Sequence, residues 1–219
     1  MIQAAIFDMD GLLIDSEPLW REAEVATFQS LGVPMTYDML DETHGRREDE
    51  LIAYWYEKFP WSGKTPGEVE EEINEKVLDL IKTDGQPKKG VKDILEFLST
   101  KDLKFAIASS SNLLFIKTVI EKFDIAEYFD ILHSGEFEEF GKPHPAIYLT
   151  TLEKLDIPAH NAIAFEDSVS GVKAAKAAQV KCIAVPEELN IGNPALDIAD
   201  KIIPSLAAFD ESMWEVING

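Results

Sequence analysis

The stretch IFDMDGLLIDSEP, residues 6–18, directly follows a short apolar run and is typical of a buried strand that ends in a loop. Asp8 and Asp10 are two residues apart, and in an extended chain this spacing sends both side chains to the same side. Converging carboxylates repel each other unless a cation lies between them. Gly11 allows the sharp turn that brings the backbone close to that point. The pattern suits a divalent metal, although aspartates also end strands to form turns.

The composition is that of an ordinary globular protein, with 46% hydrophobic and 28% charged residues in a chain of 219. This length fits one large domain or one domain with an insertion. The net charge of −21 argues against binding to nucleic acids or to anionic membranes, because both select basic patches. An anionic ligand would therefore need local positive charge or a bound cation.

The N-terminal sequence MIQAAIFDMD lacks the basic start and long apolar stretch of a signal peptide. No run reaches the roughly 18 apolar residues that a membrane-spanning helix needs. Cys182 is the only cysteine, and its apolar surroundings, KCIAVP, indicate a buried, inert thiol. We therefore expect a cytoplasmic protein, with a monomer as the default.

Apolar runs alternate with helical patterns over most of the chain, which predicts a doubly wound, Rossmann-like α/β fold with a parallel sheet. The predicted strands are residues 2–7, 104–109, 128–134, 162–167, 181–186 and 201–204. The predicted helices between them are residues 91–100, 113–123, 145–155 and 168–178. In such folds ligands bind outside the carboxyl ends of the strands.

A long insertion interrupts this alternation with helical patterns and no strand. Its helical stretches are residues 16–31, 47–59 and 67–82, with Gly- and Pro-containing breaks between them. We therefore predict an α/β core of residues 1–15 and 88–219, with a helical domain of residues 16–87 inserted after the first strand. The junctions near residues 15–18 and 84–90 are candidate hinges.

Two segments place polar side chains after predicted strands or before predicted helices. The strand 104–109 leads into Ser109, Ser110, Ser111 and Asn112. Hydroxyls and free amides at a helix N-terminus can bind an anion, and the same residues can cap the helix. In FGKPHP, Pro143 favours an extended backbone at the preceding residue, Lys142. The ammonium group of Lys142 could neutralise a phosphate. An ordinary surface lysine remains the alternative, and His144 could contact a substrate or belong to the turn.

An acidic pair, Glu166 and Asp167, ends the apolar run AIAFED. Burying two carboxylates there is unfavourable unless a cation compensates them. A hard divalent ion with several carboxylate oxygens and retained waters would do so, and Mg²⁺ fits best. Helix capping by Asp167 or Ser168 is the structural alternative.

The order DMDGLL, serine-terminated strand, GKP and EDS resembles the haloacid dehalogenase-like hydrolase superfamily over the whole chain. The resemblance implies a mobile cap for the helical insertion and a metal-assisted phosphoryl transfer. It implies that Asp8 is the nucleophile and Asp10 the general acid/base. Ser109 and Lys142 would bind the phosphoryl group, with Ser110 and Asn112 beside them. Asp8, Asp167 and the Asp10 carbonyl would hold Mg²⁺, with Glu166 assisting.

Within the superfamily, the sequence favours a phosphatase acting on a small phosphorylated metabolite, such as a sugar or sugar-alcohol phosphate. The alternative is a mutase similar to β-phosphoglucomutase, but Trp20 stands where those enzymes carry a histidine. A non-catalytic binding protein is disfavoured by the intact motif set, and a dehalogenase by the presence of Asp10.

The insertion resembles bacterial hexose-phosphate phosphatases in the stretch 43–63, THGRREDELIAYWYEKFPWSG. Arg47 could reach the phosphate or the hydroxyls of a substrate. Further candidates for the same pocket are Glu17, His44 and Arg46. Trp55 and Trp61 could stack on a sugar, but we interpret them as core residues of the insertion.

Overall fold

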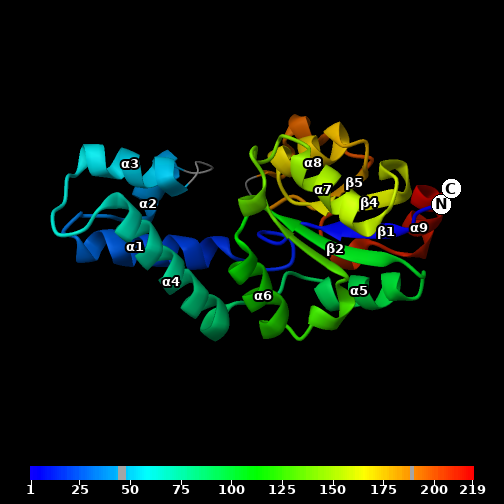
Figure 1. Cartoon of the computed structure of the whole chain (residues 1–219), viewed down its shortest axis with the longest axis horizontal. Coiled ribbons are helices and arrows are strands. Elements are labelled where there is room, and N and C mark those ends of the chain that lie inside the picture. Colours follow the sequence, from blue (N-terminus) through cyan, green and yellow to red (C-terminus); the bar gives the residue numbers. More distant parts are fainter. Residues whose placement is uncertain (44–47, 188–189) are drawn as a thin grey trace. The chain divides into compact units, whose positions relative to one another are not determined.

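A computed structural model of the chain describes residues 1–43, 48–187 and 190–219. The chain forms two compact units (Figure 1). The core unit comprises Met1–Asp15 and Gln86–Gly219, and the helical unit comprises Ser16–Gly85. We describe each unit by itself.

The described part of the core unit contains a six-stranded sheet in which every neighbouring pair of strands is parallel. The strand order is β3-β2-β1-β4-β5-β6. The strands are β1 (Ala4–Phe7), β2 (Lys104–Ser109), β3 (Ile131–Ser134), β4 (Ala162–Glu166), β5 (Lys181–Ala184) and β6 (Lys201–Ile202). The predicted doubly wound parallel sheet is therefore confirmed, and β1 lies at its centre.

Helices cover both faces of this sheet, with α7 and α8 on one face and α5 and α6 on the other (Figure 1). Their bounds are α5 (Val91–Ser99), α6 (Leu113–Lys122), α7 (Ala146–Leu155) and α8 (Val169–Ala177). The strands present small side chains such as Ala106 and Ala164 to α7 and α8. On the opposite face, the ring of Phe7 stacks on Phe105 and Phe165 across adjacent strands. Helices thus cover both faces of the sheet. A polar ligand can therefore bind only at the ends of the strands.

The helical unit consists of α1 (Glu17–Ser30), α2 (Tyr37–Leu40), α3 (Glu48–Lys58) and α4 (Pro66–Asp84) within its described part. Helix α4 packs against α1 and α3. Its start is fixed by a capping box in which Thr65 and Glu68 satisfy each other's backbone amides. Trp55 and Trp61 are buried in this unit, as expected of core residues, and the Trp55 indole donates to Thr43 Oγ1 at 3.2 Å.

Two elements were not expected from the sequence. Helix α9 (Glu211–Asn218) follows the sheet, buries Trp214 and Ile217, and begins where the Asp210 carboxylate accepts from the Met213 amide. The short helix α2 is the other. In addition, β3 begins only at Ile131, because residues Ala126–Tyr128 form a 3₁₀ turn.

The chain segments that leave and re-enter the core unit run beside each other. Ile14 and Pro87 form an antiparallel bridge. The Asp15 amide donates to Gln86 O at 3.1 Å, and the Lys88 amide donates to Leu13 O at 3.1 Å. Both predicted hinges therefore begin at one short, hydrogen-bonded ribbon.

We predict that the helical unit is more stable at acidic pH because of two half-buried carboxyls. Burial raises the pKa of Glu24 and of Glu48 from 4.5 to about 7, with nearby acidic groups adding to the rise. Folding therefore takes up protons, so that stability falls as the pH rises from about 4.5 to 7. Glu24→Gln should raise the free energy of unfolding at pH 8 by about 1–2 kcal/mol.

Urea unfolding of the full chain, followed at pH 5 and pH 8, measures this effect. Glu22→Gln, on the exposed side of the same helix, is the control and should change little at either pH. Equal stability of wild type and Glu24→Gln at pH 8 would contradict the prediction.

Candidate active site

The loop after β1 holds Asp8 in a fixed conformation at the carboxyl end of the sheet. The Asp8 amide donates to Phe165 O at 3.0 Å, which extends the pairing with β4 by one residue. The Met9 carbonyl then accepts from three amides, those of Leu12, Leu13 and Ile14. Gly11 turns the chain here with φ +71°. A Cβ on Gly11 would lie only 2.4 Å from Asp167 Oδ2, so glycine is required by conformation and by space.

Lys142 joins three strand ends through one buried ammonium group. Its Nζ donates to Asp8 Oδ1 at 2.8 Å, to Glu166 Oε1 at 2.6 Å and to the Ala108 carbonyl at 3.0 Å. Burial alone would lower the pKa of Lys142, but the two carboxylates outweigh it and raise the pKa above its ordinary value. Lys142 is therefore a permanent cation, and the interpretation as a surface lysine is wrong.

Glu166 is completely buried at the end of β4. Its Oε1 accepts from Lys142 and, at 2.5 Å, from the hydroxyl of Tyr148. Its Oε2 is buried and has no hydrogen-bond partner among the described residues. Burial raises the pKa of Glu166 to about 7, Lys142 opposes this rise, and Asp8 adds to it. A buried carboxylate oxygen without a hydrogen-bond partner is unfavourable, and a bound cation nearby would offset this cost.

Asp8, Glu166 and Asp167 form an acidic cluster whose ligand atoms all lie within 4.8 Å of one another. All three residues are buried. Burial raises the pKa of Asp167 well above its ordinary value, and the charges of Asp8 and Glu166 raise it further. Three crowded carboxylates match the all-oxygen donor set of a hard divalent ion, so the cluster could hold a metal.

Asp10 lies apart from this cluster and is oriented by hydroxyl groups. Its Oδ2 accepts from Ser111 Oγ at 2.6 Å and from Ser109 Oγ at 3.4 Å. Ser111 is held in turn, because its amide donates to Ser109 Oγ at 3.1 Å and its carbonyl accepts from Ser134 Oγ at 2.8 Å. Asp8 thus accepts from an ammonium group, and Asp10 accepts from two hydroxyl groups.

The other predicted site residues have diverse positions. Asn112 caps α6, its Oδ1 accepting from the Phe115 amide at 3.1 Å, and Ser110 is exposed beside it. Glu17 lies in α1 and forms an ion pair with Arg21 at 3.6 Å. Arg47, like the further candidates His44 and Arg46, lies outside the described residues.

Sequence reasoning missed two polar groups that organise the site. Tyr148 is buried in α7 beneath Glu166, and in sequence it looks like any core position of an amphipathic helix. Ser111 was noticed only as part of a serine run, although its hydroxyl makes the shorter contact to Asp10. The sequence does indicate a role for Tyr148, because a tyrosine at a core position carries a hydroxyl group, and a buried phenol needs a hydrogen-bond partner.

Residues 5–185 match the profile of haloacid dehalogenase-like hydrolases. The chain belongs to this family. It is 38% identical over 206 residues to hexitol phosphatase B of Escherichia coli K12, covering 94% of this chain and 93% of that protein. It is 35% identical over 200 residues to a phosphorylated carbohydrates phosphatase of Thermotoga maritima, with 90% and 91% covered.

The structure of CbbY from Rhodobacter sphaeroides in complex with phosphate has a TM-score of 0.83 and 27% identity. The match covers 95% of this chain and 96% of that one. The predicted membership in the haloacid dehalogenase-like family and the expected fold are thus confirmed, and the two curated relatives are phosphatases, the expected class of enzyme. In the described ranges, no helix is long and apolar enough to cross a membrane.

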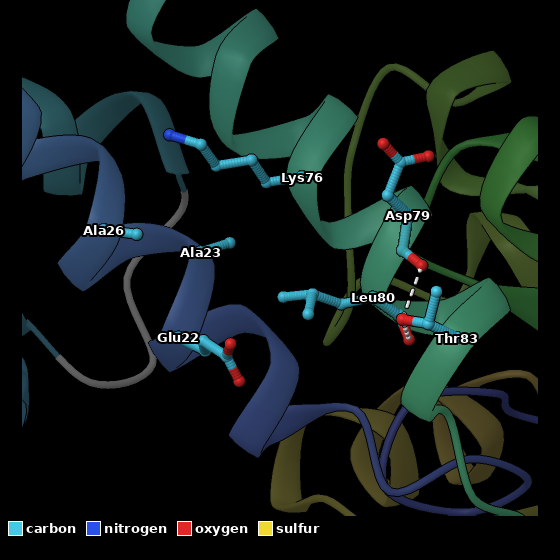
Figure 2. A pocket seen from close by; sticks show the side chains of 7 residues that line it. All are labelled: Glu22, Ala23, Ala26, Lys76, Asp79, Leu80 and Thr83. Atoms are coloured by element: carbon cyan, nitrogen blue, oxygen red, sulfur yellow. Dashed lines mark hydrogen bonds between the residues drawn. The ribbon is translucent and has the colours of Figure 1, made fainter.

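A separate cavity of about 250 Å³ lies between α1 and α4 in the helical unit (Figure 2). Its lining residues are Glu22, Ala23, Ala26, Lys76, Asp79, Leu80 and Thr83. Lys76 is already engaged, since its Nζ donates to Thr27 Oγ1 and to Glu72 Oε1, each at 2.8 Å. No lysine among the lining residues is therefore available to bind a phosphoryl group in this cavity.

We predict that Gly171→Ala destabilises the protein by about 1–3 kcal/mol, although alanine normally stabilises a helix. A Cβ on Gly171 would lie 1.7 Å from Glu166 Oε2, so the carboxylate and its bond to Lys142 would have to shift. The free energy of unfolding in guanidinium measures this. Gly67→Ala is the matched control, because Gly67 also lies in a helix and its Cβ would meet nothing within 4 Å. Equal behaviour of the two variants would show that the site tolerates the methyl group.

Proposed function

We propose that this protein is a magnesium-dependent phosphatase that hydrolyses small phosphomonoesters through an aspartyl-phosphate on Asp8. The observation that carries the proposal is the buried ammonium of Lys142, 2.8 Å from Asp8 and 2.6 Å from Glu166, at the rim of the acidic cluster. The hydrogen bond from this cation fixes the orientation of the Asp8 carboxylate, and a fixed orientation is what a nucleophile requires.

The residues present fit a bound Mg²⁺. The donor set consists of carboxylate oxygens, and one buried oxygen of Glu166 lacks a hydrogen-bond partner in the described structure. Asp8, Asp167 and the backbone carbonyl of Asp10 would hold the ion, with Glu166 assisting, as the family resemblance implies. When bound, Mg²⁺ supplies positive charge for the transferring phosphoryl oxygens. It would also let a chain with a net charge of −21 accept a dianionic substrate.

The chemistry of the chain's own residues follows from their surroundings. A carboxylate oxygen of Asp8 forms a bond to phosphorus as the bond to the ester oxygen breaks. Asp10, protonated at first, gives its proton to the departing alcohol oxygen and then takes one from the water that hydrolyses the aspartyl-phosphate. The hydroxyls of Ser111 and Ser109 fix the Asp10 carboxyl for both steps. Ser109 and Lys142 bind the phosphoryl oxygens.

A sugar or sugar-alcohol phosphate is the substrate class that we propose. Support comes from the relatives described above, one a hexitol phosphatase and the other a phosphatase of phosphorylated carbohydrates. We propose that the helical unit acts as a mobile cap whose hinges lie beyond the ribbon of Ile14 and Pro87. Arg47 remains a proposed substrate contact, and Ser110 and Asn112 remain proposed neighbours of the phosphate. A monomer in the cytoplasm remains our expectation.

We predict that Asp8→Asn lowers phosphatase activity at least about 1,000-fold, because the amide is a poor nucleophile. The variant should stay folded by circular dichroism, since Asn has the same shape and Lys142 retains Glu166 and Ala108 as acceptors. Release of inorganic phosphate from a hexose 6-phosphate in the presence of Mg²⁺ is the assay. Asp197→Asn, an exposed aspartate, serves as control. Substantial turnover by Asp8→Asn would refute the role of Asp8.

We predict that hexose phosphates yield free phosphate without a bisphosphate activator. Trp20 lies in α1, at the position where the resemblance to the mutases implies a histidine, and an indole cannot exchange a proton at neutral pH. Phosphate release and sugar-phosphate isomers should be measured together, with and without added hexose bisphosphate. Isomerised sugar phosphate with negligible free phosphate would instead favour the mutase alternative.

A further inference from the structure

Glu187 is a fourth carboxylate beside the acidic cluster, and the proposed reaction assigns it no role. It lies in the loop after β5, and only 20% of its side chain is exposed. A Cβ on Gly11 would lie 2.4 Å from Asp167 Oδ2 and 2.5 Å from Glu187 Oε1. The two carboxylate oxygens therefore lie together on the side of Gly11 where a side chain would be, at most about 5 Å apart, close enough for one water molecule to bridge them.

Lys88 approaches the same carboxylate oxygen of Glu187 that lies beside Gly11. Its Nζ is 3.9 Å from Glu187 Oε1 and 3.3 Å from Asp15 Oδ1. The first distance is long for an ion pair, and Lys88 is one-third exposed. Lys88 is thus a cationic neighbour of Glu187, and the negative charge of Glu187 adds to that of the cluster, where it raises the pKa of Asp167. Lys88 and Asp15 belong to the ribbon at which the chain leaves and re-enters the core unit.

We propose that Glu187 is a positioning residue for the metal: its carboxylate accepts a hydrogen bond from a metal-bound water. Lys88 moderates the negative charge of Glu187. This inference rests on the magnesium site of the proposed function and deepens it. Mg²⁺ gives up its water reluctantly and usually keeps several molecules, which donate to nearby oxygens. A carboxylate that faces a ligand such as Asp167 is well placed to orient one of them, and such outer partners tune metal affinity.

The same geometry opposes folding when no ion is bound. Glu187 and Asp167 bring like charges together at a half-buried place, and a bound cation or a bridging donor would relieve their repulsion. A residue that served only to hold the loop would stabilise the protein with or without metal. Glu187 should instead lower stability without metal and increase the affinity for metal. Opposite signs of these two effects distinguish a positioning role from a structural one.

Titration of the purified full chain with Mg²⁺ alone, by calorimetry, tests the proposal together with thermal unfolding in EDTA. Glu187→Gln should raise the dissociation constant for Mg²⁺ about tenfold. In EDTA the same variant should unfold at a higher temperature than wild type. Lys88→Met should act in the opposite direction and tighten Mg²⁺ binding about threefold, because it removes a competing cation. Glu139→Gln, an exposed carboxylate elsewhere in the core unit, should change neither quantity.

Unchanged Mg²⁺ affinity in Glu187→Gln would overturn the inference, as would weaker binding combined with a lower unfolding temperature in EDTA. Neither result bears on hydrolysis by the wild type. Conversely, a wild type that binds Mg²⁺ but releases no phosphate from sugar phosphates would contradict the proposed function and leave this inference standing. A wild type that binds no Mg²⁺ would overturn both.

Discussion

The ammonium of Lys142, buried among Asp8, Glu166 and the Ala108 carbonyl, is the interaction on which the site depends. Its three acceptors come from the ends of three adjacent parallel strands, β2, β1 and β4. Without this cation, two carboxylates would be buried side by side with no charge to offset them, at a cost of several kcal/mol. The sheet can keep acidic strand ends close together only because the loop before α7 returns a lysine to them. The site and the centre of the sheet are therefore stabilised by the same contacts.

The cation does not balance the cluster completely, and this imbalance gives the site its chemistry. Lys142 contacts Asp8 and Glu166, whereas Asp167 has acidic neighbours and the second oxygen of Glu166 has no hydrogen-bond partner among the described residues. A fully compensated cluster would be a structural ion-pair network with little affinity for a metal. An uncompensated one favours a divalent ion and, through it, an anionic substrate. The Asp10 carboxylate accepts instead from the hydroxyls of Ser111 and Ser109, so that the two aspartates of the motif are held by different kinds of donor.

Patterns of short range predicted most of the fold, and the failures have a common cause. Apolar runs marked all six strands of the described sheet, because both faces of the central strands are covered and most of their positions are buried, whereas β6 is exposed. The residues at strand ends were found because parallel strands bring their carboxyl ends together. Helix α9 was missed because its eight residues contain only two buried positions, Trp214 and Ile217. Tyr148 and Glu187 were missed because their partners lie in other elements, at distances that no local pattern encodes.

Two glycines allow the backbone to lie against carboxylates at the carboxyl end of the sheet. Gly11 and Gly171 lie in different segments, yet at each a single methyl group would collide with a carboxylate of the site, that of Asp167 or of Glu166. Glycine at these two positions lets the main chain approach the acidic groups directly. The backbone then packs against the carboxylates and restricts their rotamers. A divalent ion with strict geometric demands benefits from such restriction, since less conformational freedom is lost when it binds. The absence of a side chain is thus as specific a feature of the site as any of its charged groups.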